Sequence, residues 1–531
     1  MDRRLLLKQT LAVASGAFSL TGAWAGRGAL GYPFGLGVAS GAPHETGMVL
    51  WTRLTARALP SPLEAVAVRW EVGKDPGFSS LAASGTTMAM PDLGHAVHVE
   101  VQGLSPGRWY FYRFMVGDAV SDIGRTRTAP PADALPARLR FAFASCQRWE
   151  HGYYTAWRDL VEKMPDLVVF LGDYIYEYAS PRNPQTPLVR SHGLRHAVSL
   201  ADYRDRYALH KSDADLRAAH QACPWIATWD DHEVENDYAG ERGQAEPTAF
   251  AAQRVAAYQA FYENMPLPAS ALVRGLQGLG SQGAVRVHTR HAFGRLARFH
   301  LLDTRQFRDV QACRDGVGGA GGTGSGGRGT VRAADCPALD APGRTLLGED
   351  QERWVADGLA EDGRDGRVRW SILAQQTLFS PRHYGGAHGS NPPVPTDTWD
   401  GYPAARQRMR AAIQAAAPRN AVFVGGDIHQ NYVCDVHAGD APGTTRIATE
   451  FCGTSITSQS GASPTRLASL QQQNPHIVFA NSEKRGYALV ELTPRGWDTQ
   501  LRAVDEIDNP SSTVSTLAKF SLEDGRPGIE R

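Results

Sequence analysis

Short apolar runs alternate with longer amphipathic stretches from residue 139 onward, and this pattern predicts a layered α/β domain. Residues 167–171 are all apolar, and Gly172 follows them. An apolar run without alternation is typical of a strand buried on both faces of a sheet. Further strands are predicted at residues 139–145, 225–229, 284–289, 296–303, 369–373 and 421–425. Helices are predicted between them at residues 153–163, 200–221, 250–264, 349–361 and 403–417.

The two flanks of this domain have different patterns. Residues 32–128 contain short strands separated by Pro and Gly turns, which predicts a small β-sandwich whose final strands resemble a fibronectin-III-like module. After a Pro-rich linker at 129–132, we expect the α/β domain to span residues 139–505. Residues 510–531 include a short amphipathic segment at 517–522, for which we expect a packed terminal helix.

The first 25 residues, 1–25, predict an export signal. Arg3 and Arg4 precede a mildly apolar stretch at 10–23, and Ala23-Trp24-Ala25 offers a cleavage site after Ala25. Two interpretations stay open: a twin-arginine signal for a protein exported already folded, and an ordinary secretory signal whose arginines form the positive n-region. Both place the mature protein in the periplasm or outside the cell.

Composition narrows the function classes. The 531 residues contain 55 Lys+Arg and 55 Asp+Glu, so no excess of positive charge indicates binding to nucleic acid or to an anionic membrane. Beyond the N-terminus no apolar run is long enough to span a bilayer, so we expect no transmembrane anchor. We also expect the protein to be a monomer. Six cysteines are too few for a disulfide scaffold. Cys313 and Cys336 nevertheless bracket a glycine-rich loop at 316–332 and are candidates for pairing.

Polar side chains collect where four of the predicted strands end. Asp173, Tyr176 and Glu177 follow the strand 167–171 within one turn of chain. A phenol ligates a metal only when the ion is acidic enough to remove its proton, so a carboxylate and a phenol on one loop indicate a strongly Lewis-acidic ion, iron first. The alternative is an ordinary strand end whose Asp caps a helix. The other three ends carry Cys146, the segment 230–237, and the pair Asp427 and His429. Such ends converge in α/β folds.

Three blocks among these residues carry a resemblance to a known family. Residues 172–176 read Gly-Asp-Tyr-Ile-Tyr and match a GDxxY block. Residues 230–233 read Asp-Asp-His-Glu in the place of GNHE, and residues 426–429 read Gly-Asp-Ile-His in the place of GHxH. The chain therefore resembles the calcineurin-like binuclear metallophosphatases.

Departures from the general pattern narrow this resemblance to one branch. Asp231 stands where that superfamily has Asn, Asp427 where it has the first His, Cys146 where it has the first Asp, and Gln376 where a further His follows a strand. The PhoD-type alkaline phosphatases and phosphodiesterases share these departures. The resemblance implies an α/β fold with a calcineurin-like layered β-sandwich core flanked by helices. It also implies that the C-terminal segment lies over the active site as a lid.

The resemblance further implies two kinds of metal ion with Asp173 between them. Ferric iron, Fe(3+), is expected at Cys146, Asp173, Tyr176 and His429. Calcium, Ca(2+), is expected at Asp173, Asp231 and Asp427, with Asn236 or Gln376 as a further candidate. From the residues alone, Asp231 and Asp427 favour a hard site of oxygen ligands. The Cys146 thiol and the Tyr176 phenol favour a softer anionic site, and neither set identifies its ion.

Three further residues are expected to act on the substrate. His232 matches the His of GNHE and is expected to give a proton to the leaving oxygen or to hold the phosphate. Arg305 is the best donor to phosphate oxygens, unless it pairs with Asp303 or Asp309. Trp229 is expected to form part of the pocket wall.

These features predict an exported phosphatase that hydrolyses phosphomonoesters and phosphodiesters by metal-activated water, with phosphate esters and the twin-arginine export machinery as partners. One alternative is a phospholipase-type phosphodiesterase. Another is a non-catalytic, metal-stabilised protein that binds polyanions.

Overall fold

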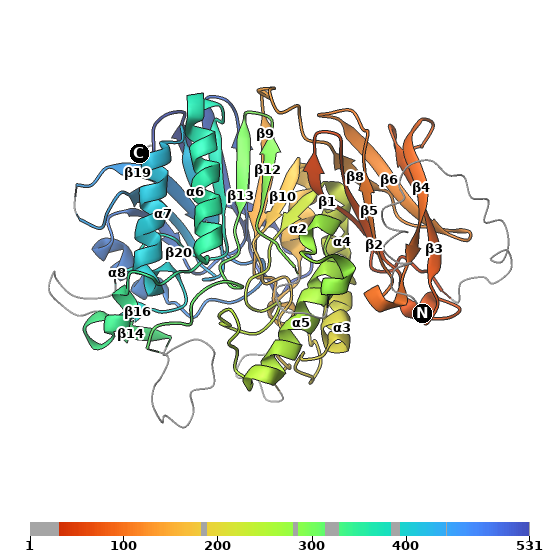
Figure 1. Ribbon diagram of the computed structural model, residues 1–531, viewed down its shortest axis with the longest axis horizontal. Helices are drawn as coiled ribbons and strands as arrows, with labels where there is room; N and C mark the ends of the chain where they lie inside the picture. The colour runs from red at the N-terminus through yellow and green to blue at the C-terminus, as the bar shows by residue number, and fades with distance from the viewer. Residues whose placement is uncertain are drawn as a thin grey trace.

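Two large β-sheets face each other at the centre of the molecule (Figure 1). The computed structural model describes residues 31–181, 188–279, 285–313, 329–383, 393–441 and 443–529, so the expected signal peptide lies outside the described residues. Within these ranges, the first sheet has the order β23 (Val514–Glu523), β22 (Gly496–Val504), β21 (Arg485–Leu492), β9 (Leu139–Ala144), β10 (Leu167–Phe170), β11 (Trp225–Ala227), β1 (Val38–His44), β2 (Gly47–Arg53) and β5 (Ala96–Val101). The second sheet has the order β12 (Thr289–Phe293), β13 (Ala297–Leu301), β15 (Trp370–Ala374), β17 (Ala421–Gly425), β19 (Arg446–Cys452), β18 (Asn431–His437) and β20 (Ile477–Asn481).

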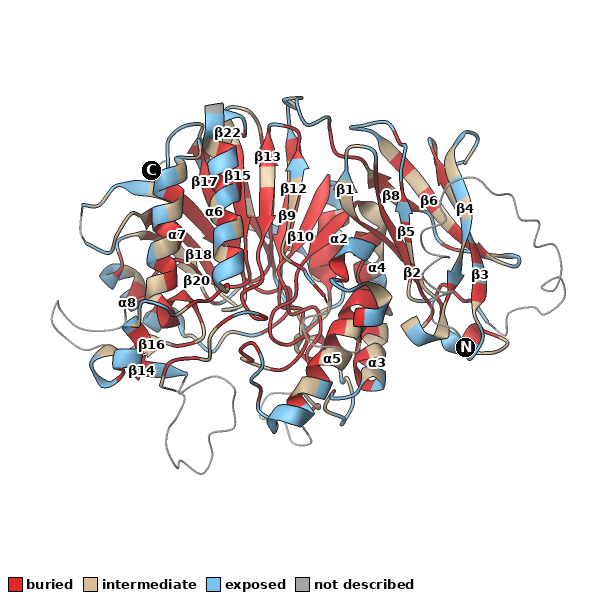
Figure 2. Cartoon of the chain, viewed as in Figure 1, coloured by how far each residue is buried: buried red, intermediate tan, exposed pale blue. Residues whose placement is uncertain are grey.

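The residues of β10 explain why its sequence does not alternate. Val169 faces the second sheet and packs with Phe141 and Phe299 in the core between the sheets. Val168 and Phe170 face the other way, into the core beneath the covering helices. Both faces of the strand are therefore apolar and buried, as the sequence predicts, and Figure 2 shows this central layer as almost continuously buried.

Helices cover the outer face of each sheet, which confirms the layered α/β prediction (Figure 1). The first sheet is covered by α2 (Thr155–Lys163), α3 (Leu200–Lys211), α4 (Ala214–Ala222) and α5 (Pro247–Asn264). The second sheet is covered by α6 (Glu349–Gly363) and α7 (Pro403–Ala416), while α8 (Pro464–Gln473) packs beside β20. The helix predicted at 200–221 is two helices, because the Asp213 side chain accepts hydrogen bonds from Asp215 N and Leu216 N and starts α4. None of the helices in the described ranges combines the length and apolar character needed to cross a bilayer.

The N-terminal β-sandwich shares a sheet with the α/β layer. A third sheet of β3 (Val66–Gly73), β4 (Leu81–Ala89), β6 (Trp109–Val116), β7 (Ala119–Val120) and β8 (Gly124–Arg127) packs on β1, β2 and β5 through one apolar cluster. Those three strands also extend the first sheet, because β1 pairs in parallel with β11. The Trp51 indole Nε1 donates to Glu263 O of α5 at 3.0 Å. The module is therefore built into the layer that carries the strand ends.

The predicted C-terminal helix is wrong: residues 514–523 form strand β23. This strand pairs with β22 along its whole length at the edge of the first sheet. Lys519, Phe520, Ser521 and Leu522 alternate in burial, which is the period of a strand. Gly528 N then donates to the Thr449 side chain, so the end of the chain ties the first sheet to the second. Residues 514–523 are fixed in the sheet and do not form a helical lid.

The predicted pair Cys313 and Cys336 forms a disulfide in the structure. Most of the glycine-rich segment between them lies outside the described residues. The bond joins positions 23 residues apart, and closing a loop of that size stabilises a folded chain by about 3 kcal/mol. The double variant Cys313→Ser/Cys336→Ser is therefore expected to unfold at lower urea concentration with unchanged turnover. A reductant should shift the wild type to the same midpoint, and equal midpoints without reductant would contradict the prediction.

Candidate metal centre

Loops from both sheets meet at the carboxyl ends of their parallel strands. β9, β10 and β11 run parallel in the first sheet, and β13, β15, β17 and β19 run parallel in the second. The loops that follow these strands carry Cys146, Asp173, Asp231, Arg305 and Asp427. The convergence is that expected for strand ends in α/β folds.

The backbone turns sharply at four of these loop positions. Cys146, Asp173, Asp427 and His429 all have left-handed backbone conformations, with φ of 60°, 58°, 65° and 55°. Asp and His tolerate this region better than most residues, although each position still costs about 1–3 kcal/mol. At Gly172, φ is 104° and a Cβ atom would lie 2.4 Å from Asp230 Cβ, so only glycine lets the two loops approach. Strain is concentrated where the polar side chains converge.

One side of the centre combines sulfur, nitrogen and oxygen donors. Ligand atoms of Cys146, Asp173 and His429 all lie within 4.8 Å of one another. The Tyr176 hydroxyl lies beside them, 2.8 Å from Asp173 Oδ2 and 3.2 Å from His429 Nε2. His429 Nδ1 lies 3.0 Å from Gln459 O, which holds the proton on Nδ1 and leaves Nε2 as a lone-pair donor. The structure thus brings together all four residues of the softer predicted site.

The other side of the centre is made of carboxylates. Ligand atoms of Asp230, Asp231 and Asp427 lie within 4.8 Å of one another, and Asp173 makes a second such group with Asp231 and His232. Asp173 belongs to a group on each side of the centre, as the bridging role predicts. Asp230 is a member that sequence reasoning missed, although it directly precedes Asp231 after β11 and stands in the same four-residue block.

Buried oxygen atoms in this cluster lack hydrogen bonds. Asp173 Oδ1, Asp230 Oδ2 and Asp231 Oδ1 are buried and have no hydrogen-bond donor in the described part of the chain. Burial, and then the neighbouring carboxylates, raise the pKa of Asp173 and of Asp230 well above the ordinary range. Burial raises the pKa of Asp427 to about 6. Bound cations neutralise buried negative charge and coordinate oxygen atoms that accept no hydrogen bond, so the residues fit a metal centre.

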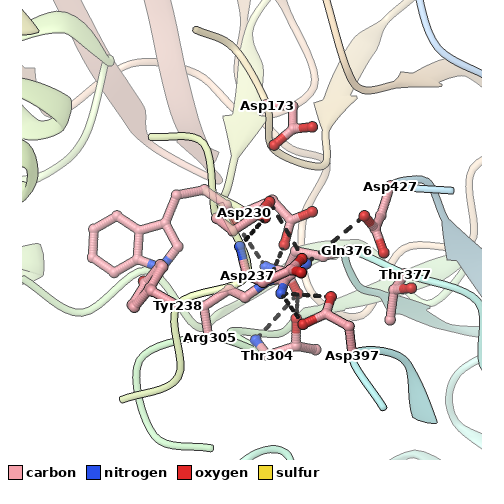
Figure 3. A network of polar contacts seen from close by, with 12 residues as sticks. Asp173, Asp230, Asp237, Tyr238, Thr304, Arg305, Gln376, Thr377, Asp397 and Asp427 are labelled. Carbon is pink, nitrogen blue, oxygen red and sulfur yellow. Dashed lines mark hydrogen bonds and ion pairs between the residues drawn. The ribbon is translucent and has the colours of Figure 1, made fainter. Parts of the chain in front are cut away.

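Arg305 is a cation that the chain itself supplies to this cluster (Figure 3). Its side chain is 1% exposed and lies between carboxylates. Nε donates to Asp230, Nη1 lies 2.8 Å from Asp397 Oδ2, and Nη2 lies 3.8 Å from Asp427 Oδ1. Neither Asp303 nor Asp309, the partners considered from sequence, forms an ion pair with its guanidinium in the described residues. Sequence reasoning missed Asp397, which follows a segment with no strand or helix signal.

A buried carboxylate holds His232. Glu177 Oε2 lies 2.7 Å from His232 Nδ1, and Glu177 Oε1 accepts the backbone N–H of Asn236 at 2.9 Å. Burial opposes the charged imidazole, but Glu177, Asp231 and Asp173 outweigh it and raise the pKa of His232 well above its usual range. These carboxylates favour the protonated imidazole in the metal-free protein, and the hydrogen bond to Glu177 leaves Nε2 for other partners.

Two other predicted residues lie in the packing around the centre. The Trp229 ring stacks on Tyr258 of α5 with centroids 4.3 Å apart, inside the core, so its contact with substrate stays a prediction. The Gln376 amide joins the two sheets, because its oxygen accepts from Thr304 and its nitrogen donates to Trp229 O and Leu302 O. With both ends engaged, Gln376 is better suited to hold the loops than to bind an ion.

The raised pKa of Asp427 predicts a pH effect on the metal-free protein. The folded pKa of about 6 exceeds the unfolded value of about 3.9, so the folded state binds more protons and stability falls as pH rises from ~4 to ~6. With Asp427→Asn, the free energy of unfolding should fall by about 2–3 kcal/mol less over this pH range. Urea unfolding in the presence of a chelator at several pH values measures the difference. The exposed Asp508→Asn is the control, and equal slopes for the two variants would contradict the prediction.

Comparison with known proteins agrees with this geometry. Residues 141–501 match the PhoD-like phosphatase family, and residues 21–130 match the PhoD-like phosphatase N-terminal domain. Alkaline phosphatase D of Bacillus subtilis (strain 168) is 40% identical over 540 residues, which cover 99% of this chain and 86% of that protein. The solved structure of PhoD aligns with a TM-score of 0.85 and 39% identity, over 94% of this chain and 92% of that one. The chain belongs to the PhoD-like phosphatase family.

Proposed function

We propose that this protein is an exported, metal-dependent phosphoric-ester hydrolase that acts on phosphomonoesters and phosphodiesters. The observation that carries the proposal is the set of buried carboxylate oxygens of Asp173, Asp230 and Asp231 that accept no hydrogen bond within the described residues, beside a thiol, a phenol and an imidazole. Membership of the PhoD-like phosphatase family and the likeness to alkaline phosphatase D support the same reaction.

The chemistry of the donors supports two kinds of ion. Cys146, Asp173, Tyr176 and His429 would hold ferric iron, because a thiolate and a phenolate suit a strongly Lewis-acidic ion. Asp173, Asp231 and Asp427 would hold calcium, which prefers carboxylate oxygens, and Asn236 is a further candidate ligand. When bound, the two ions would supply Lewis acidity to a phosphoryl oxygen and to the attacking water.

The residues of the chain then have distinct roles. Glu177 orients His232 through Nδ1, and the protonated imidazole gives its proton to the leaving oxygen. Arg305 was expected to contact phosphate, yet its guanidinium is buried among four carboxylates. This packing supports a positioning role, in which Arg305 offsets part of the negative charge and fixes the orientation of Asp230.

A twin-arginine leader would suit this centre, because that route carries folded proteins and the ligands come from loops that are far apart in sequence. The compartment proposed is therefore the periplasm or the exterior.

Elemental analysis of the exported protein, combined with assays of p-nitrophenyl phosphate and its bis-ester, tests the proposal. We expect iron and calcium, loss of turnover in EGTA, and recovery on addition of calcium. Zinc or manganese in place of these ions would overturn the assignment of Asp231 and Asp427 while keeping the phosphatase. A protein without metal and without turnover would favour the polyanion-binding alternative.

A further inference from the structure

A cavity of about 320 Å³ opens beside the metal centre and has no role in the proposed reaction. One part of its lining is Gln430 and Tyr432, around the start of β18, and another is Gly461 with Arg466 of α8. The Leu467 and Leu470 side chains form its apolar floor. The cavity thus combines an apolar surface with a guanidinium and a side-chain amide.

The backbone links both parts of this lining directly to His429. Gln430 is the next residue in the chain, and the His429 ring lies 3.0 Å from Gln459 O, two residues before Gly461. His429 is therefore a neighbour of both parts of the lining, in the chain or by hydrogen bond, and it also belongs to the Asp173 side of the centre.

The loop 427–430 brings the centre to the solvent-exposed surface. Cys146, Asp173, Tyr176 and Asp231 are buried, whereas the loop 427–430 is partly exposed at each of its positions. Gly461 and Arg466, at the rim of the cavity, are exposed as well. A substrate that reaches the centre along this loop passes the mouth of the cavity.

We infer that this cavity is the subsite for the organic part of the phosphate ester, a small group with an apolar face and a second anionic or hydrogen-bonding end. The inference rests on the proposed function and adds the class of substrate to it. A volume of 320 Å³ lies at the small end of the ligand-pocket range, about 300–1,000 Å³, so a single ring or a short carbon chain fits and a diacyl lipid does not. Arg466 supplies the charge that selects an anionic end.

Filling the cavity tests the inference. A Cβ atom on Gly461 would meet no heavy atom within 4 Å, and its backbone is not left-handed, so Gly461→Phe is tolerated and narrows the space. Its KM for p-nitrophenyl phosphate should rise about tenfold. The Ki of inorganic phosphate, which has no organic part, should stay within about twofold of the wild type. Gly343→Phe, in similarly open space and not in the lining, is the matched control.

Replacing the guanidinium tests the charge. Arg466→Gln should raise KM about tenfold for 3-phosphoglycerate, which carries a carboxylate, and less than about twofold for glycerol 3-phosphate. An unchanged KM in both variants would overturn the subsite, as would a Ki of inorganic phosphate that rises in parallel with KM. Absence of turnover in the wild type would instead overturn the proposed function, and the subsite with it.

Discussion

Asp173→Asn is expected to reduce kcat/KM by ~10³-fold or more, because Asp173 belongs to a candidate ligand group on each side of the centre. Asn keeps the size of the side chain, and it tolerates the left-handed backbone at φ 58°, so the loop is expected to keep its shape. What is lost is the negative charge that two cations would share. Steady-state kinetics and the metal content of the purified variant measure the effect.

The same substitution should stabilise the metal-free protein. Burial and the neighbouring Asp231 raise the pKa of Asp173, which means that its charge is unfavourable in the folded state without a cation. A neutral amide removes this penalty, so urea unfolding in chelator should require more denaturant than for the wild type. Asp118→Asn, at an exposed turn, is the matched control and should change neither quantity. A variant that is both inactive and less stable would indicate that Asp173 supports the loop rather than a metal.

Arg305→Met is expected to lower the free energy of unfolding by about 3–5 kcal/mol, because it removes the cation that pairs with the buried carboxylate of Asp230. Met has a similar length, so the loss is mainly electrostatic. Asp230 is 1% exposed and would lose this ion pair, whereas Asp397 is 19% exposed and would still pair with Arg308. Chemical unfolding of the metal-free variant measures the effect.

A second substitution separates charge from packing. Arg305→Met/Asp230→Asn removes one of the unpaired charges and should recover part of the lost stability. The exposed pair formed by Arg353 and Asp350 provides the control, since Arg353→Met should cost less than about 1 kcal/mol. Equal losses at Arg305 and Arg353 would contradict the role given to the buried network.

The sequence allowed the strand ends to be predicted well, because a buried parallel strand has a strong local signal. Apolar runs locate β9, β10, β11 and β17 to within about two residues, and the polar residues that follow them converge in the structure. The disulfide was also predicted, since two cysteines bracket one glycine-rich segment. These features depend on residues that are close together in the chain.

Features that depend on distant partners could not be predicted in the same way. Asp397 pairs with Arg305 from a loop that carries no periodic signal, so nothing local indicates its role. Residues 517–522 are too few to separate the period of a strand from that of a helix, and pairing with β22 decides the outcome. The burial of Arg305 likewise reflects four carboxylates that come from three separate loops. Position along a strand predicts proximity, but it does not predict which charges pair.

The pairing of β9 with β21 determines when the centre can form during synthesis. Residues 139–144 need residues 485–492 as a neighbouring strand, and Ile456 N and the Ser458 hydroxyl donate to the carbonyls of Ser145 and Cys146. The ribosome must therefore release nearly the whole chain before the Cys146 loop is held in place, and contacts so distant in sequence form slowly. Loading of the proposed metal ions would thus follow translation, and a nascent chain that stops short of β21 leaves β9 with an open strand edge.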